Sequence, residues 1–187
     1  MRLPRRKNVR IKEYDYTLGN WYYVTICTHN KKCILGKIIN GKMYLNEYGK
    51  IVKECLLESQ THFQNVEIEY YVIMPNHIHC IIIIDSKSEL KISNEDVSPG
   101  AADTGWETQP LQTKQKILKP SLGQIVVYIK YQSSRKINIM HNTKGEKLWQ
   151  RNYFEHIIRN EMDLYNVRNY IKFNPLKWDI EKNYPDN

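Results

Sequence analysis

The sequence has 187 residues, of which 41% are hydrophobic and 26% are charged, and this composition excludes both a disordered polar chain and a bundle of membrane helices. The length is typical of a single domain, which we expect to span residues 1–187. Lysines and arginines (28) outnumber acidic residues (20), and the net charge of +8 favours a polyanionic partner.

The longest apolar run, residues 80–84, is far shorter than the roughly 20 residues that span a bilayer, so we expect no membrane association and a cytoplasmic location.

The sequence begins with a basic segment, residues 1–12. Its six lysines and arginines are Arg2, Arg5, Arg6, Lys7, Arg10 and Lys12. A cluster of like charges can lie along the phosphates of a nucleic acid, or it can remain a solvated tail. Both interpretations are open from the residues alone.

The first elements after this arm are a strand and a helix. Aromatic and β-branched residues over 21–29 predict the strand, and Gly36 and Gly41 predict turns after it. Asn46 is a favourable N-cap, and it predicts a helix over residues 47–62, where apolar residues recur at helical spacing.

Two further strands, residues 66–73 and 77–84, are joined by a short turn that contains a proline, which predicts a hairpin. The composition then changes. Residues 86–120 are rich in Ser, Glu, Asp, Thr, Gln, Gly and Pro without an apolar period, so we expect a flexible insertion there.

The last third of the sequence predicts a helix, a strand and a helix. Ser121 caps a helix that extends to about residue 139, a strand follows over 153–159, and Asn160 begins the final helix. The order of elements lacks regular βαβ alternation. We therefore predict an α+β fold with a mostly antiparallel sheet flanked by helices.

The pair His77 and His79 is the sharpest chemical feature. Alternate residues of a strand share a face, so both imidazoles are predicted to project together while Ile78 points to the other face. Two adjacent imidazoles can form half of a metal site, or they can each bond to backbone and water at the end of the strand. The spacing alone leaves both options open.

Tyr170 and Asn174 are the second feature, because residues four apart share one face of a helix. The phenol is a possible nucleophile and the amide a possible third metal ligand. The alternatives are a structural tyrosine, one of 14, and an asparagine that ends the helix because Pro175 follows it.

The third feature is the run of residues 148–153 (LWQRNY), where aromatic and polar side chains are interleaved. Trp149 and Arg151 could stack on bases and contact phosphates, or they could be a core tryptophan and a surface arginine. His156, shortly after, could face the site or the solvent.

Together these pieces resemble the single-tyrosine HUH transposases, and most closely the REP-associated tyrosine transposases. The resemblance has five blocks in the same order: 22–28 (YYVTICT), 74–79 (MPNHIH), 121–123 (SLG), 149–157 (WQRNYFEHI) and 170–175 (YIKFNP). It covers nearly the whole chain except the insertion. It implies a ferredoxin-like fold, similar to that of RNA-recognition modules, with an antiparallel sheet flanked by helices.

By this resemblance, His77 and His79 are the metal-binding pair, Tyr170 is the nucleophile and Asn174 is the polar third ligand. Some relatives have Gln at the position of Asn174, and both residues supply an amide oxygen. The implied ion is Mg²⁺ or Mn²⁺, which suits imidazole and oxygen ligands with open coordination positions.

The resemblance also implies the reaction and the partner. The expected activity is the cleavage and rejoining of single-stranded DNA near a hairpin or repeat, through a covalent 5′-phosphotyrosine. The basic arm, Trp149 and Arg151 are our predictions for holding the DNA. The protein would act beside the nucleoid as a monomer or a homodimer.

Two other function classes fit the same residues. One is a noncatalytic nucleic-acid-binding module on the RRM-like fold, in which His77, His79 and Tyr170 only pack or stack. The other is a metal-dependent hydrolase in which the two histidines serve to activate water.

Overall fold

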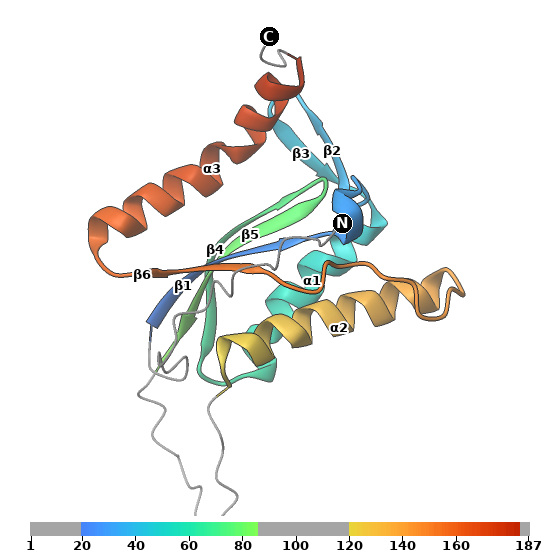
Figure 1. Cartoon of the computed structure of the whole chain (residues 1–187), viewed down its shortest axis with the longest axis horizontal. Helices are drawn as coiled ribbons and strands as arrows, with labels where there is room; N and C mark the ends of the chain where they lie inside the picture. Colours follow the sequence, from blue (N-terminus) through green and yellow to red (C-terminus); the bar gives the residue numbers. More distant parts are fainter. Residues whose placement is uncertain (1–19, 86–119, 184–187) are drawn as a thin grey trace, which may run out of the picture.

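The structure is a computed structural model, and it describes residues 20–85 and 120–183 (Figure 1). The predicted basic arm and all but the last residue of the predicted insertion lie outside the described residues. Among the helices of the described part, none combines the length and the apolar character needed to cross a membrane.

The elements follow one another in this order: β1 (Asn20–Cys27), a 3₁₀ turn (His29–Lys31), β2 (Gly36–Ile39), β3 (Lys42–Leu45), α1 (Glu47–His62), β4 (Val66–Met74), β5 (His77–Ile84), α2 (Leu122–Met140), β6 (Phe154–Ile158) and α3 (Glu161–Asn183). Four of the strands (β1, β4, β5 and β6) form one sheet with the order β4-β5-β1-β6, and every neighbouring pair is antiparallel. This is the βαββαβ arrangement of ferredoxin-like folds, so the predicted α+β class is confirmed.

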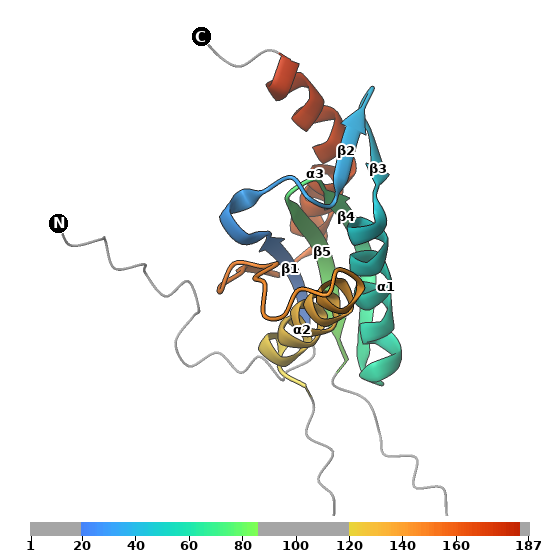
Figure 2. The same ribbon diagram turned by 90° about the vertical axis from the view of Figure 1, so that its right-hand side faces the viewer.

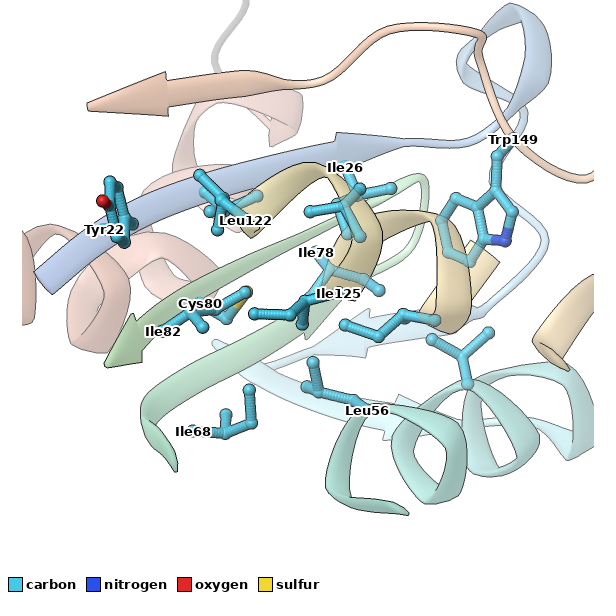
Figure 3. Close-up of a cluster of buried hydrophobic side chains, with 14 of the residues drawn as sticks. Tyr22, Ile26, Leu56, Ile68, Ile78, Cys80, Ile82, Leu122, Ile125 and Trp149 are labelled. Atoms are coloured by element: carbon cyan, nitrogen blue, oxygen red, sulfur yellow. The ribbon is translucent and has the colours of Figure 1, made fainter. Parts of the chain in front are cut away.

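The two faces of the sheet carry different helices. Helices α1 and α2 cover one face, and α3 crosses the other (Figure 1). Alternation along β1 explains the division: Tyr22 packs with the α1 and α2 side, and Tyr23 packs with the α3 side. The larger core lies between the sheet and the α1–α2 pair (Figure 3).

All three predicted helix starts are confirmed, and before α3 the Asn160 side chain accepts a hydrogen bond from the Asp163 N–H (2.8 Å). The Asn46 side chain accepts a hydrogen bond from the Gly49 N–H (3.0 Å), and Ser121 forms a capping box with Gln124. Each cap satisfies a backbone donor that the first turn of a helix leaves without a partner. The predicted hairpin of β4 and β5 is also present, with Met74 opposite His77.

Two features differ from the sequence predictions. The segment around Gly36 and Gly41 forms a second sheet, the β2–β3 hairpin, because Asn40 (φ 51°) and Gly41 (φ 69°) adopt the left-handed conformations of a tight hairpin turn. Helix α3 continues through Pro175 instead of ending before it.

The continuation of α3 has a tertiary cause. The proline costs a hydrogen bond within the helix, but the segment beyond it lies beside the β2–β3 hairpin in both views (Figure 2). The Gly41 N–H donates to the Asp179 carboxylate at 3.0 Å. Packing on the hairpin therefore offsets the local helix-breaking tendency.

Candidate functional site

The two histidines of β5 project from the sheet face that α3 covers. Their Nε2 atoms lie 2.9 Å apart, and the rings meet edge to face. Ile78, between them, is fully buried in the core on the opposite face. The prediction that His77 and His79 share one face of the strand is confirmed.

The second nitrogen of each ring has a defined partner. His77 Nδ1 lies 2.5 Å from Asn76 Oδ1. His79 Nδ1 lies 2.7 Å from Tyr23 Oη and 2.9 Å from Thr25 Oγ1. These partners fix the orientation of both rings, as the outer partners of metal-binding histidines do.

Two proton arrangements fit these contacts. In the first, each Nδ1–H donates to its oxygen partner, and both Nε2 lone pairs point toward the space between the rings, where a cation can accept them. In the second, the His79 Nε2–H donates to His77 Nε2, and a hydroxyl donates to His79 Nδ1. The hydroxyls of Tyr23 and Thr25 can serve both, because a hydroxyl donates or accepts.

Burial keeps both imidazoles neutral. It lowers the pKa of His77 to about 4, with a further lowering by the positive charge of Lys31, and it lowers the pKa of His79 to about 3, with a smaller contribution from His77. A neutral imidazole has the free lone pair that a metal ligand requires.

One stripe of α3 lies over these histidines. The Tyr170 ring centroid is 5.2 Å from that of His79, and the Trp178 centroid is 5.8 Å from that of His77. Asn174 stands halfway between them at helical spacing and is buried. The structure therefore brings His77, His79 and Tyr170 together, and it puts Asn174 on the helix stripe that faces the two imidazoles.

The side chains here could supply three ligands to a divalent ion and leave its other coordination positions open. Two imidazole nitrogens come from β5 and one amide oxygen comes from α3, and water or phosphate oxygens would complete the coordination. Within residues 20–85 and 120–183, no group of three or more His, Cys, Asp or Glu side chains is placed to hold a metal ion. A metal ion bound to His77 and His79 would therefore need further ligands, and the buried Asn174 amide is a candidate for one of them.

Tyr23 is a site residue that sequence reasoning missed. Besides its contact with His79, its ring meets the Tyr170 ring edge to face, with centroids 6.1 Å apart. Burial raises the pKa of the Tyr23 phenol above its usual value, so this hydroxyl stays protonated and is unsuited to be the nucleophile. The sequence contains one signal for this residue. In a strand, Tyr23 lies between Tyr22 and Val24, so its side chain points to the opposite face from these two core residues.

A cavity of about 680 Å³ opens beside Tyr170. Its lining comes from β1, β5, β6 and α3, and consists of Tyr23, Thr25, His79, Phe154, His156, Asp163, Asn166, Val167 and Tyr170. We call this space the Tyr170 cavity. His156 pairs with Asp163 at 2.9 Å and lines this cavity, so of the two orientations that the sequence left open its side chain takes the one toward the site.

The predicted DNA-binding residues have different outcomes. Trp149 is buried, and its indole Nε1–H donates to Ser133 Oγ at 2.9 Å, so the prediction that it stacks on bases is wrong for this structure. It is a core residue on the α2 side (Figure 3). Arg151 is exposed, as a phosphate contact would need. The six basic residues of the predicted arm lie outside the described residues; they are Arg2, Arg5, Arg6, Lys7, Arg10 and Lys12.

Comparisons with known proteins find relatives in sequence and a solved structure with a similar fold. No family model matches the chain. An uncharacterised protein of Haemophilus influenzae strain Rd is 34% identical over 184 residues, which are 98% of this chain and 96% of that protein. A second protein of this strain, named as a REP-associated tyrosine transposase, is 24% identical over 177 residues, covering 91% of this chain and 80% of its own length.

A solved structure shares the fold. It is that of a REP-associated tyrosine transposase bound to a REP hairpin, and it matches 95% of this chain and 74% of its own chain with a TM-score of 0.52 at 21% identity. The chain is therefore similar in sequence to a protein named as a REP-associated tyrosine transposase, and it shares the fold of a solved REP-associated tyrosine transposase.

Proposed function

We propose that the chain is a metal-dependent transposase that cleaves and rejoins single-stranded DNA through a covalent bond to Tyr170. One observation carries the proposal: a partly exposed tyrosine at a cavity edge lies against an oriented, neutral pair of imidazoles. A hydrolase would not require Tyr170 to stand at the histidine pair.

The reaction balances without an energy cofactor. Tyr170 Oη forms a bond to the phosphorus while the bond from phosphorus to the 3′ oxygen breaks. The phenol loses its proton and the leaving 3′ oxygen gains one, which gives a 5′-phosphotyrosine and a free 3′-hydroxyl. The bond energy is kept in the phosphodiester, so a 3′-hydroxyl can reverse the step and join strands.

The chain's own residues prepare this step. His77, His79 and Asn174 would hold Mg²⁺ or Mn²⁺, and the bound ion would polarise the scissile phosphate and offset its charge. Tyr23 keeps His79 in place and packs against the Tyr170 ring. Helix α3 presents Tyr170 from a rigid element, which favours an in-line approach to the phosphate.

The proposed substrate is a DNA hairpin with a single-stranded flank. The related structure in complex with a REP hairpin supports this choice, as does the net charge of +8. An unstacked strand can bring its phosphate in line with a fixed tyrosine more easily than a duplex can. DNA as substrate would place the protein in the cytoplasm with the nucleoid.

A labelled hairpin oligonucleotide incubated with Mg²⁺ or Mn²⁺ tests the proposal. We expect a protein–DNA adduct that survives denaturation, that is lost with chelator, and that Tyr170→Phe abolishes while DNA binding persists. Tyr165→Phe is the matched control, because Tyr165 is an exposed tyrosine on the same helix that does not line the cavity.

The competing functions give different results in this assay. A hydrolase would release cleaved DNA without an adduct in both wild type and Tyr170→Phe. A binding module would shift the DNA without cleaving it. An adduct that persists in Tyr170→Phe would contradict the assignment of the nucleophile.

A further inference from the structure

The lining of the Tyr170 cavity includes residues that the proposed reaction does not use. The register of the sheet shows how: Thr25 pairs with His79 on one side and with Phe154 on the other, and Tyr23 pairs with His156. The α3-facing side chains of β6 therefore lie next to those of β1, one strand away from the histidine pair. The proposed reaction assigns no role to the side chains of Phe154 and His156, which line the cavity.

Two aromatic rings with free surface border this cavity. The Phe154 side chain is 48% exposed and Tyr170 is 47% exposed, although both belong to the lining. Tyr23 meets each ring edge to face, with centroids 6.1 Å apart in both cases, and so supports both. Exposed aromatic faces at a nucleic-acid site are suited to stacking on an unstacked base.

The polar groups of the cavity favour a base over a phosphate. Asp163 supplies a carboxylate, whose oxygens lie 2.9 and 3.0 Å from His156 Nε2, and an anionic wall repels a phosphate. Asn166 is exposed one helical turn away, and its amide makes no hydrogen bond with another described residue. Such an amide can donate to and accept from the edge of a base.

These observations also restrict the base. Carboxylate oxygens only accept hydrogen bonds, and the Asn166 amide contributes a further acceptor oxygen. Adenine, cytosine and guanine each offer an exocyclic amino group with two N–H donors, whereas thymine offers the single donor N3–H and so satisfies fewer of these acceptors. The volume of about 680 Å³ lies in the range of ordinary ligand pockets and leaves room for one nucleotide.

We propose that the Tyr170 cavity binds one unstacked, amino-bearing nucleobase of the strand that Tyr170 attacks. Phe154 supplies a stacking surface and Asn166 reads the edge of the base beside Asp163. The base belongs to a nucleotide near the scissile phosphate, since Tyr170 borders the same cavity. This inference rests on the proposed function for the identity of the strand.

A pool of hairpin oligonucleotides with randomised single-stranded flanks tests the inference. The pool is incubated with the full-length wild type, Asn166→Ala, Phe154→Ala or Asn169→Ala in the presence of Mn²⁺. Asn169→Ala is the matched control, because it makes the same change on the same helix outside the cavity lining. Non-covalently bound DNA and covalent adducts are then sequenced separately.

For the wild type, we expect thymine to be depleted about fivefold or more at one flank position, the ratio that a good base contact provides. Asn166→Ala should reduce the depletion below about twofold at that position only, and Asn169→Ala should keep it. Phe154→Ala should weaken the binding of the whole pool about tenfold, which is typical for the loss of one stacked base.

Three outcomes would overturn the inference: no base preference in the wild type, a preference that Asn166→Ala leaves unchanged, or an equal loss in Asn169→Ala. The two proposals can fail separately. A preference that depends on Asn166 in bound DNA without any adduct would keep the base pocket and contradict the transesterase. Adducts without a base preference would keep the transesterase and contradict the base pocket.

Discussion

The His79 imidazole shows how the candidate site orients a side chain and keeps it neutral. The side chain is almost fully buried, and each ring nitrogen has a polar partner within hydrogen-bond distance. A charged imidazolium there would lose solvent on all sides and have no anion beside it. The ring is therefore held neutral and in one orientation.

Stability should depend on this neutral state. In the unfolded chain, His79 binds a proton near its ordinary pKa of 6.5, whereas in the folded chain its pKa is about 3. The unfolded state therefore binds more protons below pH 6.5, and the free energy of unfolding falls as the pH falls, by ~2 kcal/mol from His79 at pH 5.

Urea denaturation of chelator-treated protein at pH 7 and pH 5 measures this effect. The pH-dependent loss should be smaller by that amount in His79→Gln, which cannot bind a proton. Equal losses in the two proteins would show that His79 titrates normally in the fold.

Tyr23 should act on metal affinity through His79. Tyr23→Phe removes the closer of the two oxygens at His79 Nδ1 and leaves the Thr25 hydroxyl at 2.9 Å. Loss of such an outer partner typically costs 10- to 100-fold in metal affinity, and we expect about tenfold here because Thr25 remains. Titration with Mn²⁺ followed by electron paramagnetic resonance measures it, and Tyr44→Phe, an exposed tyrosine on β3, is the control.

At the scale of elements, the position of α3 decides whether the site exists. Val167 and Ile171 pack its N-terminal half onto the sheet, and the β2–β3 hairpin contacts the half beyond Pro175. A third contact between α3 and the sheet is an ion pair. Arg168 of α3 pairs with Glu69 of β4, at the point where the pairing register of β4 shifts. Tyr170 is two residues from this ion pair.

The Glu69–Arg168 pair should couple the helix to the sheet. A double-mutant cycle with Glu69→Gln and Arg168→Gln should give a coupling of ~1 kcal/mol in the free energy of unfolding, because Glu69 is shielded while Arg168 remains accessible. Chemical denaturation of the four proteins measures it. Additive losses would mean that packing alone holds this half of α3.

The segment between α2 and β6 is held by core contacts. Trp149 donates to Ser133, and the Lys130 ammonium donates to the backbone oxygens of Gln150, Arg151 and Asn152. These contacts fix the start of β6 and leave the Arg151 side chain exposed. Trp149 is thus a structural residue.

Trp149→Phe separates this role from base stacking. The substitution removes the indole donor and part of a buried ring, so we expect a loss of ~1–3 kcal/mol in the free energy of unfolding. DNA affinity at a temperature where the variant is folded should change less than twofold. A loss comparable to that of a stacked base, about tenfold, would restore the stacking role.

At the scale of the whole molecule, the net charge of +8 favours binding to DNA, and the number of phosphates that basic side chains contact sets how the proposed binding responds to salt. Each phosphate contact that a basic side chain makes releases counterions, so the logarithm of the affinity should fall steeply and linearly with the logarithm of salt concentration. Arg151→Gln should make this slope shallower by about one unit. Fluorescence anisotropy of a labelled hairpin measures the slope, and a flat response would contradict the electrostatic part of the proposed function.

Local sequence patterns predicted much of the fold. Alternation in β5 predicted that His77 and His79 share one face of the strand, and helical spacing predicted that Tyr170 and Asn174 share one face of α3. The capping residues Asn46 and Ser121 predicted where two helices begin. These signals succeed because strand and helix periods are properties of the chain over a few residues. The sequence also determined the chemical types available: imidazole, amide and phenol.

Tertiary structure decided what these groups face. The pairing of β1 with β5 brought Tyr23 and Thr25 to His79, and packing on the hairpin carried α3 past Pro175. Burial made Trp149 a core residue, although its neighbours resembled a stacking motif. Each of these outcomes depends on contacts between segments far apart in the chain, and a local period contains no information about which segments will meet.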